Sequence, residues 1–270
     1  MDRSLAVLGA GNMGLAITDG ILASGCLAAD KITLVRRSIH LLSEYESKGC
    51  IVSDDIESAA NASDVLILAF KPQKMDEIYK SISNICDRKL VISIAAGVKI
   101  ETIENNLPGA HIVRAMPNTP LTVMEGVTHI CAGESVTADE LAFAKSLFQC
   151  SGTVFECKEE EINALTALTS SSVAYFAAVE NAMVEWAKNN GLSNYDEETI
   201  CSLVSKTALG SSKLMLEKHI SPKELIKAVA SPNGTTEKAL KVFDIMKLDD
   251  IFNHAMTACL KRAAELSSSK

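Results

Sequence analysis

The sequence lacks any C-x-x-C pair, although it contains eight cysteines, at positions 26, 50, 86, 131, 150, 157, 201 and 259. This spread excludes a zinc knuckle and a thioredoxin-like redox motif, and the five histidines are equally scattered. We therefore expect reduced cysteines that act as small hydrophobic residues of an intracellular protein, and we predict no metal site.

Basic clusters and long apolar runs are also missing. The formal net charge is -8 and the charged residues are mixed along the chain, so no nucleic-acid partner is expected. The longest apolar runs, 65–70 and 90–96, are far shorter than the ~20 residues of a membrane-spanning helix. A first strand that begins by Ser4 leaves no room for a signal sequence. We expect a cytoplasmic protein with no membrane partner.

Hydrophobic patterning divides the chain at about residue 157. Up to that point, short β-branched runs alternate with helical patterns. Because these runs are apolar throughout, they are typical of strands in a parallel sheet that is covered by helices on both faces. The predicted fold class of residues 1–157 is therefore α/β, a Rossmann-like doubly wound parallel sheet that binds a dinucleotide. The expected strands are 5–8, 32–35, 65–69, 90–94 and 112–115.

Residues 158–270 show helical spacing with almost no strand signal, which predicts an all-α C-terminal domain. Breaks at 190–191, 219–222 and 231–234 divide this domain into about four or five helices. Long apolar helices with few partners in their own chain often associate. We therefore expect a homodimer or a larger homo-oligomer formed through this domain, which also binds the substrate.

A glycine-rich turn follows the first expected strand. It has the pattern G-x-G-x-x-G, leaves an apolar strand and enters a helix. In dinucleotide sites the first glycine allows a tight turn, the second lets the backbone approach the pyrophosphate, and the third allows close helix–strand packing. An ordinary strand–helix turn is the alternative. We predict cofactor-binding residues at Gly9, Gly11, Asn12, Met13 and Gly14.

Two arginines and a serine follow the second expected strand. Arg36, Arg37 and Ser38 lie where an NAD-binding chain places a carboxylate, roughly 20 residues beyond the glycine turn. Guanidinium groups pair with phosphate oxygens, so this segment favours the 2′-phosphate of NADPH over NADH. Solvated surface arginines are the alternative.

Later strands contribute small residues and a lysine at their carboxyl ends. Open parallel sheets bind ligands at this edge. We therefore add Ala69, Lys71, Pro72 and Ala95 to the predicted cofactor site, and a surface lysine at a helix start is the alternative for Lys71.

Two further motifs carry a resemblance to a known family. Residues 113–120 read Val-Arg-Ala-Met-Pro-Asn-Thr-Pro, and residues 228–240 read Ala-Val-Ala-Ser-Pro-Asn-Gly-Thr-Thr-Glu-Lys-Ala-Leu. With the opening glycine turn and Lys71-Pro72-Gln73, they resemble pyrroline-5-carboxylate reductase in order and spacing from residue 4 to about residue 265.

The resemblance implies a reaction and residue roles. It implies an NADPH-dependent oxidoreductase of the CH-NH group that reduces the cyclic imine Δ1-pyrroline-5-carboxylate to L-proline, the last step of proline biosynthesis. It places Met116, Pro117 and Asn118 beside the nicotinamide. It also implies that the hydroxyl of Thr236, the predicted catalytic residue, hydrogen-bonds the substrate ring nitrogen.

The turn within the second motif suits a small anion through its own chemistry. Pro232 fixes one backbone angle, while Asn233 and Gly234 are suited to positive φ, so successive amides can converge ahead of a helix that begins near Thr235. These amides, the helix N-terminus and nearby hydroxyls would hold a carboxylate, with roughly 1.5–3 kcal/mol from each charge-assisted bond. An ordinary capped helix is the alternative. The predicted substrate-binding residues are Ser231, Asn233, Gly234, Thr235 and Thr236.

One segment departs from the family pattern. Ser170-Ser171-Ser172-Val173 stands where the family carries Gly-Ser-Gly-Pro. The change adds side-chain bulk and predicts a helix without the kink of proline. Two alternatives therefore stay open: a reductase of a related cyclic imine on the same scaffold, and a non-catalytic NADPH-binding homologue. A β-hydroxyacid dehydrogenase is disfavoured because the segment 165–178 contains no lysine.

Overall fold

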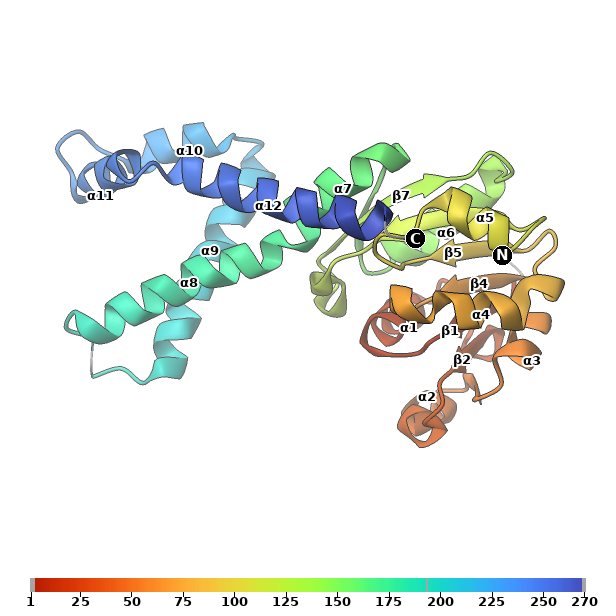
Figure 1. Ribbon diagram of the computed structural model, residues 1–270. Helices are drawn as coiled ribbons and strands as arrows, with labels where there is room; N and C mark the ends of the chain where they lie inside the picture. The colour runs from red at the N-terminus through yellow and green to blue at the C-terminus, as the bar shows by residue number, and fades with distance from the viewer. Residues whose placement is uncertain (1–2, 193, 269–270) are drawn as a thin grey trace. The chain divides into compact units, whose positions relative to one another are not determined.

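The computed structural model describes residues 3–192 and 194–268 (Figure 1). These residues form two compact units. Unit 1 contains the described residues up to Ser171 together with those from Ala258 on, and unit 2 contains the described part of Ser172–Thr257. The boundary between the compact units thus lies at residue 171, and the C-terminal segment belongs to unit 1. Hydrophobic patterning predicted domains of 1–157 and 158–270.

Unit 1 is built on one eight-stranded sheet, in the order β3-β2-β1-β4-β5-β6-β7-β8. The first six strands are parallel, β7 is antiparallel to β6, and β8 is parallel to β7. The crossover from β3 back to β4 beside β1 is the doubly wound arrangement, which confirms the predicted fold class. The strands are β1 (Leu5–Leu8), β2 (Ile32–Val35), β3 (Ile51–Ser53), β4 (Val65–Leu68), β5 (Leu90–Ser93), β6 (His111–Met116), β7 (Gly126–Ala132) and β8 (Gly152–Glu156).

Two hydrophobic cores cover the two faces of the sheet. Along β1, Leu5 and Val7 join the core formed with α1 and α6, while Ala6 and Leu8 join the core formed with α3, α4 and α5. Because both faces are buried, the central strands read as continuous apolar runs. The helices of this unit that precede residue 171 are α1 (Asn12–Ser24), α2 (Ser43–Ser47), α3 (Ile56–Asn61), α4 (Met75–Ile82), α5 (Ile100–Asn106), α6 (Ala138–Gln149) and α7 (Ile162–Leu165).

A π-helical turn interrupts the helical stretch after α7. This turn, η7 (Thr166–Ser170), ends where the Ser171 amide donates to the Thr166 carbonyl at 2.9 Å, and α8 begins at Ser172. The Ser-Ser-Ser-Val departure removes the proline, as the sequence shows, but the helix is still interrupted by the π-helical turn that ends at Ser170.

The helices that follow are α8 (Ser172–Asn189), α9 (Glu197–Lys218), α10 (Pro222–Val229), α11 (Thr235–Ile245) and α12 (Leu248–Ser268). The residues of α12 from Ala258 on belong to unit 1. All three predicted breaks are confirmed. A fourth break precedes α12, where Lys247 has a φ of 54°, and sequence patterning missed it because lysine is not a turn-forming residue.

Much of the apolar surface of unit 2 has no partner within the unit. In the described part of the chain, its core consists of Val184, Ala187 and Ile200, with Leu192 and Val204 packed against it. Several large apolar side chains of this unit are exposed, namely Phe176 and Trp186 on α8, Leu209 and Leu216 on α9, and Ile245 on α11. Exposed apolar area of this kind marks surfaces that associate.

One helical segment, residues 159–189, is long and apolar enough by length and composition alone to cross a membrane. One such segment is weak evidence, because core helices of soluble proteins and signal sequences also meet these criteria of length and composition. Counting uninterrupted apolar runs did not register this segment, since polar residues interrupt it.

Candidate functional site

The glycine turn between β1 and α1 is fixed to the neighbouring strand. The amides of Gly9 and Ala10 donate to the Val35 carbonyl of β2 at 3.0 and 2.8 Å, and Gly9 has a φ of 94°. A Cβ at position 9 would lie 2.8 Å from the Ala69 carbonyl oxygen. Both the backbone angle and the available space therefore require glycine here.

The other two glycines of the turn meet different constraints. A Cβ at Gly14 would lie 3.0 Å from the Gly9 carbonyl oxygen and 3.0 Å from Cγ1 of Val7, so α1 packs tightly on β1 at this point. A Cβ at Gly11 would meet no atom closer than 3.9 Å. Gly11 is also the N-cap of α1 and supplies no side-chain cap. The first-turn amides of α1 are thus available to an anion, as a bound pyrophosphate requires.

A cavity of about 450 Å³ extends from this turn along the carboxyl ends of β1, β2 and β4. It brings together seven of the predicted cofactor residues: Gly9, Gly11, Arg36, Arg37, Ser38, Ala69 and Lys71. The predicted residues outside its lining are Asn12, Met13, Gly14, Pro72, Ala95, Met116, Pro117 and Asn118. Sequence reasoning missed seven further lining residues, Val35, Asp54, Ile56, Phe70, Lys74, Glu77 and Ile78.

The charges in this cavity favour a phosphate. Four cationic side chains, from Arg36, Arg37, Lys71 and Lys74, line it against two carboxylates, from Asp54 and Glu77. Glu77 accepts weak contacts from Arg37 at 3.5 Å and from Lys74 at 3.4 Å. Exposed ion pairs contribute little free energy, so Arg37 and Lys74 can leave Glu77 at little cost and pair with a bound phosphate instead.

Arg36 is oriented differently from Arg37. Its Nη1 donates to the Ala10 carbonyl at 3.4 Å, which holds the half-buried guanidinium beside the glycine turn. Arg37 projects into solvent, with a side chain 80% exposed. The cavity therefore contains one guanidinium that is hydrogen-bonded beside the glycine turn and one that is exposed.

Asn118 is committed to contacts within the protein. Its buried side-chain amide donates to the Thr169 carbonyl at 3.1 Å, and its Oδ1 accepts from the Val127 amide at 2.8 Å. Asn118 thus ties the loop after β6 to the π-helical turn and to β7. Its predecessors Met116 and Pro117 are half-buried and buried, respectively, at the end of β6.

His129 of β7 packs against the same π-helical turn. Its Nε2 lies 3.2 Å from Oγ1 of Thr169, which itself donates to the Leu165 carbonyl at 2.8 Å. Nε2 must therefore carry the imidazole proton. Among the described residues the buried Nδ1 has no hydrogen-bond partner, and burial lowers the pKa of His129. The ring is thus neutral near pH 7, stacked on Phe155 at a centroid distance of 6.0 Å.

The predicted substrate turn lies in unit 2, ahead of α11. Asn233 has the expected positive φ, 58°, but Gly234 has a φ of -78° and forms the N-cap of α11. The prediction of positive φ at Gly234 was therefore wrong. A single left-handed residue already turns the chain into the helix, so the next one adopts the extended angles of an N-cap.

Two amides of this turn are already engaged. The Asn233 amide donates to Oε2 of Glu237 at 2.6 Å, and the Gly234 amide donates to the Ser231 carbonyl at 3.0 Å. Because glycine supplies no side-chain cap, the first-turn amides of α11 remain open to an anion. Thr236 in this first turn is half-buried. A hydrogen bond from Lys241 lowers the pKa of Glu237, which was absent from the predicted site.

The remaining substrate residues are accessible. Ser231, Asn233 and Thr235 are exposed, and Gly234 is half-buried. The predicted cofactor residues all belong to unit 1 and the predicted substrate residues all belong to unit 2.

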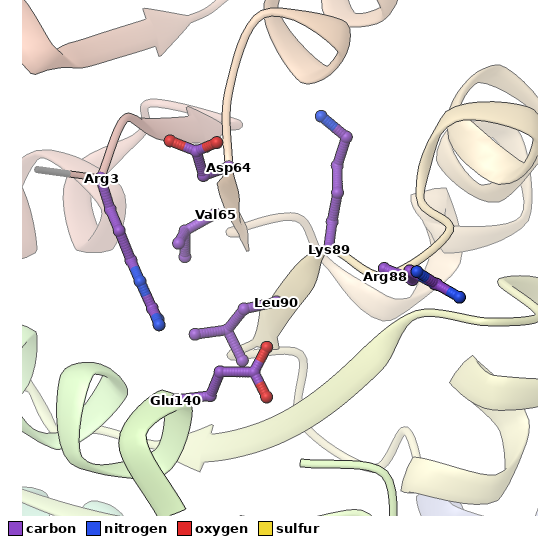
Figure 2. A pocket seen from close by; sticks show the side chains of 7 residues that line it. All are labelled: Arg3, Asp64, Val65, Arg88, Lys89, Leu90 and Glu140. Atoms are coloured by element: carbon purple, nitrogen blue, oxygen red, sulfur yellow. The ribbon is translucent and has the colours of Figure 1, made fainter. Parts of the chain in front are cut away.

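Another cavity, of about 350 Å³, opens at the amino ends of β1, β4 and β5. Figure 2 shows that its cationic side chains, from Arg3, Arg88 and Lys89, point in different directions. Its carboxylates are occupied: Asp64 accepts from Ser4 and Glu140 lies beside His111. The cations do not converge on one point, so this cavity lacks the arrangement of an anion site. In residues 3–192 and 194–268, no cluster of three or more His, Cys, Asp or Glu suits a metal ion.

Two family models match the chain. Residues 159–266 match the model described as pyrroline-5-carboxylate reductase dimerisation, and residues 4–97 match the model described as NADP oxidoreductase, coenzyme F420-dependent.

Individual relatives match over the whole chain. The pyrroline-5-carboxylate reductase of Synechocystis sp. is 35% identical over 270 residues, covering 98% of this chain and 99% of that protein. The structure of a pyrroline-5-carboxylate reductase from Coxiella burnetii has a TM-score of 0.91 and 34% identity, covering 99% of both chains. The Plasmodium falciparum pyrroline carboxylate reductase with NADP bound shares the fold, with a TM-score of 0.88, 23% identity and 98% of both chains covered. From this identity over nearly its full length, the chain belongs to the pyrroline-5-carboxylate reductase family.

Proposed function

We propose that this protein reduces the carbon–nitrogen double bond of Δ1-pyrroline-5-carboxylate to give L-proline, with NADPH preferred over NADH. The observation that carries the proposal is the cavity of unit 1, in which a glycine turn and an open helix N-terminus adjoin four cationic side chains. The substrate assignment rests on membership of the family and on the anion-suited turn ahead of α11.

In unit 1 the residues act by binding and orientation. The first-turn amides of α1 would bind the pyrophosphate, while Arg36, Arg37, Ser38 and Lys71 would bind the 2′-phosphate. The bound cofactor supplies the hydride. Because the contact between Arg37 and Glu77 is weak, the binding of the cofactor would release Arg37 to turn toward the 2′-phosphate.

In unit 2 the turn at 231–236 holds the substrate. The open first-turn amides of α11 and the hydroxyls of Ser231 and Thr235 bind the carboxylate. The hydroxyl of Thr236 donates to the ring nitrogen, or accepts from it when the imine is protonated, and so orients the carbon that is reduced. A protonated imine gives the neutral ring amine directly on hydride addition, and a neutral imine would take the one proton that its nitrogen needs from water, so no acidic side chain is assigned.

The Thr236 hydroxyl provides the direct test. Thr236→Ala should lower kcat/KM for pyrroline-5-carboxylate at least tenfold, equivalent to ~1.4 kcal/mol of transition-state stabilisation, while Thr236→Ser retains most of it. Thr153→Ala, on the exposed face of the edge strand β8, is the matched control. Wild-type protein that binds NADPH but oxidises none with this substrate would contradict the proposed reaction.

Cofactor preference has a separate test. Arg36→Ala should reduce kcat/KM with NADPH by roughly 10- to 100-fold, corresponding to one charge-assisted contact of about 1.5–3 kcal/mol, and should leave NADH little affected. An equal loss with both cofactors would show that Arg36 does not read the 2′-phosphate.

The exposed apolar helices of unit 2 support a homo-oligomer formed through the helical domain. Sedimentation equilibrium should give a mass that is a multiple of 28.9 kDa, and a monomer would contradict this assignment. All eight cysteines are free, which suits a reducing compartment such as the cytoplasm.

A further inference from the structure

The loop after β5, residues 94–99, lies on the path of the nicotinamide half of the cofactor. The cavity of unit 1 covers the carboxyl ends of β2, β1 and β4, where the proposed function places the adenosine and phosphate end of the cofactor. The next strand in the sheet is β5. Because a dinucleotide extends along the carboxyl edge of such a sheet, its other half reaches past β4 toward this loop.

The last turn of α12 lies against that loop. A Cβ at Gly97 would be 3.1 Å from the Leu266 carbonyl oxygen, 3.2 Å from its carbonyl carbon and 3.3 Å from its Cβ. Gly97 also has a φ of 74°. The loop and the helix end therefore lie close together, and a side chain at position 97 would both press against Leu266 and adopt a strained backbone angle.

The helix end is itself anchored within unit 1. The hydroxyl of Ser267, a buried residue, lies 2.9 Å from the Ala263 carbonyl of its own helix and 3.2 Å from Oδ1 of Asn163 in α7. Two turns earlier, Sγ of Cys259 donates to Oγ of Ser171 at 3.2 Å. The final turns of α12 are thus fixed to the segment around the π-helical turn.

We propose that Leu266 and Ser267 are positioning residues for the cofactor: the anchored end of α12 sets the conformation of residues 95–97 and so the position of the nicotinamide. This inference rests on the proposed use of NADPH. It assigns no chemical step to either residue. Ala95 is the predicted cofactor residue through which the effect acts, and it is buried with its amide 3.3 Å from Oγ of Ser93.

Shortening the chain tests the anchor directly. A chain ending at Glu265 lacks the whole contact, whereas a chain ending at Ser268 keeps it and serves as the control. We expect the shorter chain to show about a tenfold rise in the KM for NADPH and in the Kd for NADP+, with less than a twofold change in the KM for the imine. Unchanged NADPH parameters in the shorter chain would overturn the proposal.

Gly97→Ala separates positioning from a general loss of stability. Gly25→Ala is its matched control, because Gly25 has a similar φ of 67° but no atom within 4 Å of a Cβ. Both variants should lose thermal stability, and only Gly97→Ala should raise the KM for NADPH, again about tenfold. In the chain ending at Glu265, Gly97→Ala should add little to that rise, since the two changes remove one contact.

The outcomes distinguish the two proposals. Additive effects of Gly97→Ala and the shortened chain would mean that the loop and the helix end act independently, which refutes the positioning role. Wild-type protein that fails to bind NADP+ would instead refute the proposed function.

Discussion

Alanine substitutions at Gly14 and Gly11 should separate the folding role of the glycine turn from its binding role. Gly14 lies inside α1 with helical geometry, and a methyl group there would meet the Gly9 carbonyl oxygen and Val7 Cγ1, both at 3.0 Å, and the Ala69 Cβ at 3.4 Å. Two of these three atoms are rigid backbone or Cβ positions. A methyl group at Gly11 would face open space.

The magnitudes follow from these contacts. At Gly14, alanine gains about 1 kcal/mol of helix propensity but overpacks a rigid contact at a cost of about 1–3 kcal/mol. We expect a net loss of up to about 2 kcal/mol, which lowers the Tm by up to roughly 8 °C for a domain of this size. At Gly11, alanine can adopt the extended N-cap angles and costs at most about 1 kcal/mol, because alanine is a poor N-cap.

Binding should follow the opposite order. The added methyl group at Gly11 occupies the path by which the pyrophosphate approaches the α1 amides, so the Kd for NADP+ should rise at least tenfold, about 1.4 kcal/mol. Differential scanning calorimetry and isothermal titration calorimetry on both variants measure the two effects. If Gly11→Ala binds NADP+ as tightly as the wild type while Gly14→Ala unfolds normally, the assignment of roles within the turn is refuted.

Two further predictions concern the region around the π-helical turn. Asn118→Ala leaves the Val127 amide and the Thr169 carbonyl without their partner, so it should lower the free energy of unfolding by about 1–3 kcal/mol in urea titrations. Asn106→Ala is the control, because it removes only an exposed hydrogen bond within its own helix, and it should change the free energy of unfolding by less than about 0.5 kcal/mol. Burial lowers the pKa of His129 below the ordinary 6.5, so the unfolded chain binds its proton first and stability should fall as the pH drops below about 6.5. The same titrations at pH 7.5 and 5.5 should show a smaller pH effect in His129→Gln, and an unchanged pH effect would contradict the neutral buried imidazole.

The strands that sequence patterning located are those buried on both faces. All five expected strands are present, with ends displaced by at most one residue. The missed strands β3 and β8 lie at the two edges of the sheet, where one side of each strand is exposed and the apolar run disappears. In β7 the run is interrupted by Thr128 and His129, whose burial depends on partners that only the tertiary structure provides.

The candidate site divides in the same way. The glycine turn and Arg36 were predictable because each follows a strand in a fixed, local geometry. Asp54, Lys74 and Glu77 come to the same cavity from loops and helices whose positions the local sequence does not define. Residue identity alone also could not show that the Asn118 side chain hydrogen-bonds other parts of the protein. An asparagine beside a ligand site can contact the ligand or can join two segments of the protein.

The interruption after α7 shows why the loss of a proline did not straighten the chain. Thr166 and Thr169 donate to the carbonyls of Ile162 and Leu165, four residues back, at 2.7 and 2.8 Å. Such back-bonding competes with the helical amides for these carbonyls and bends helices. The Ser171 amide donates to the carbonyl five residues back, that of Thr166, instead of four residues back, and this bond widens the helical turn. Asn118 and His129 also contact Thr169 from outside the helix, so hydroxyl groups and two buried partners hold the interrupted turn in place without glycine or proline.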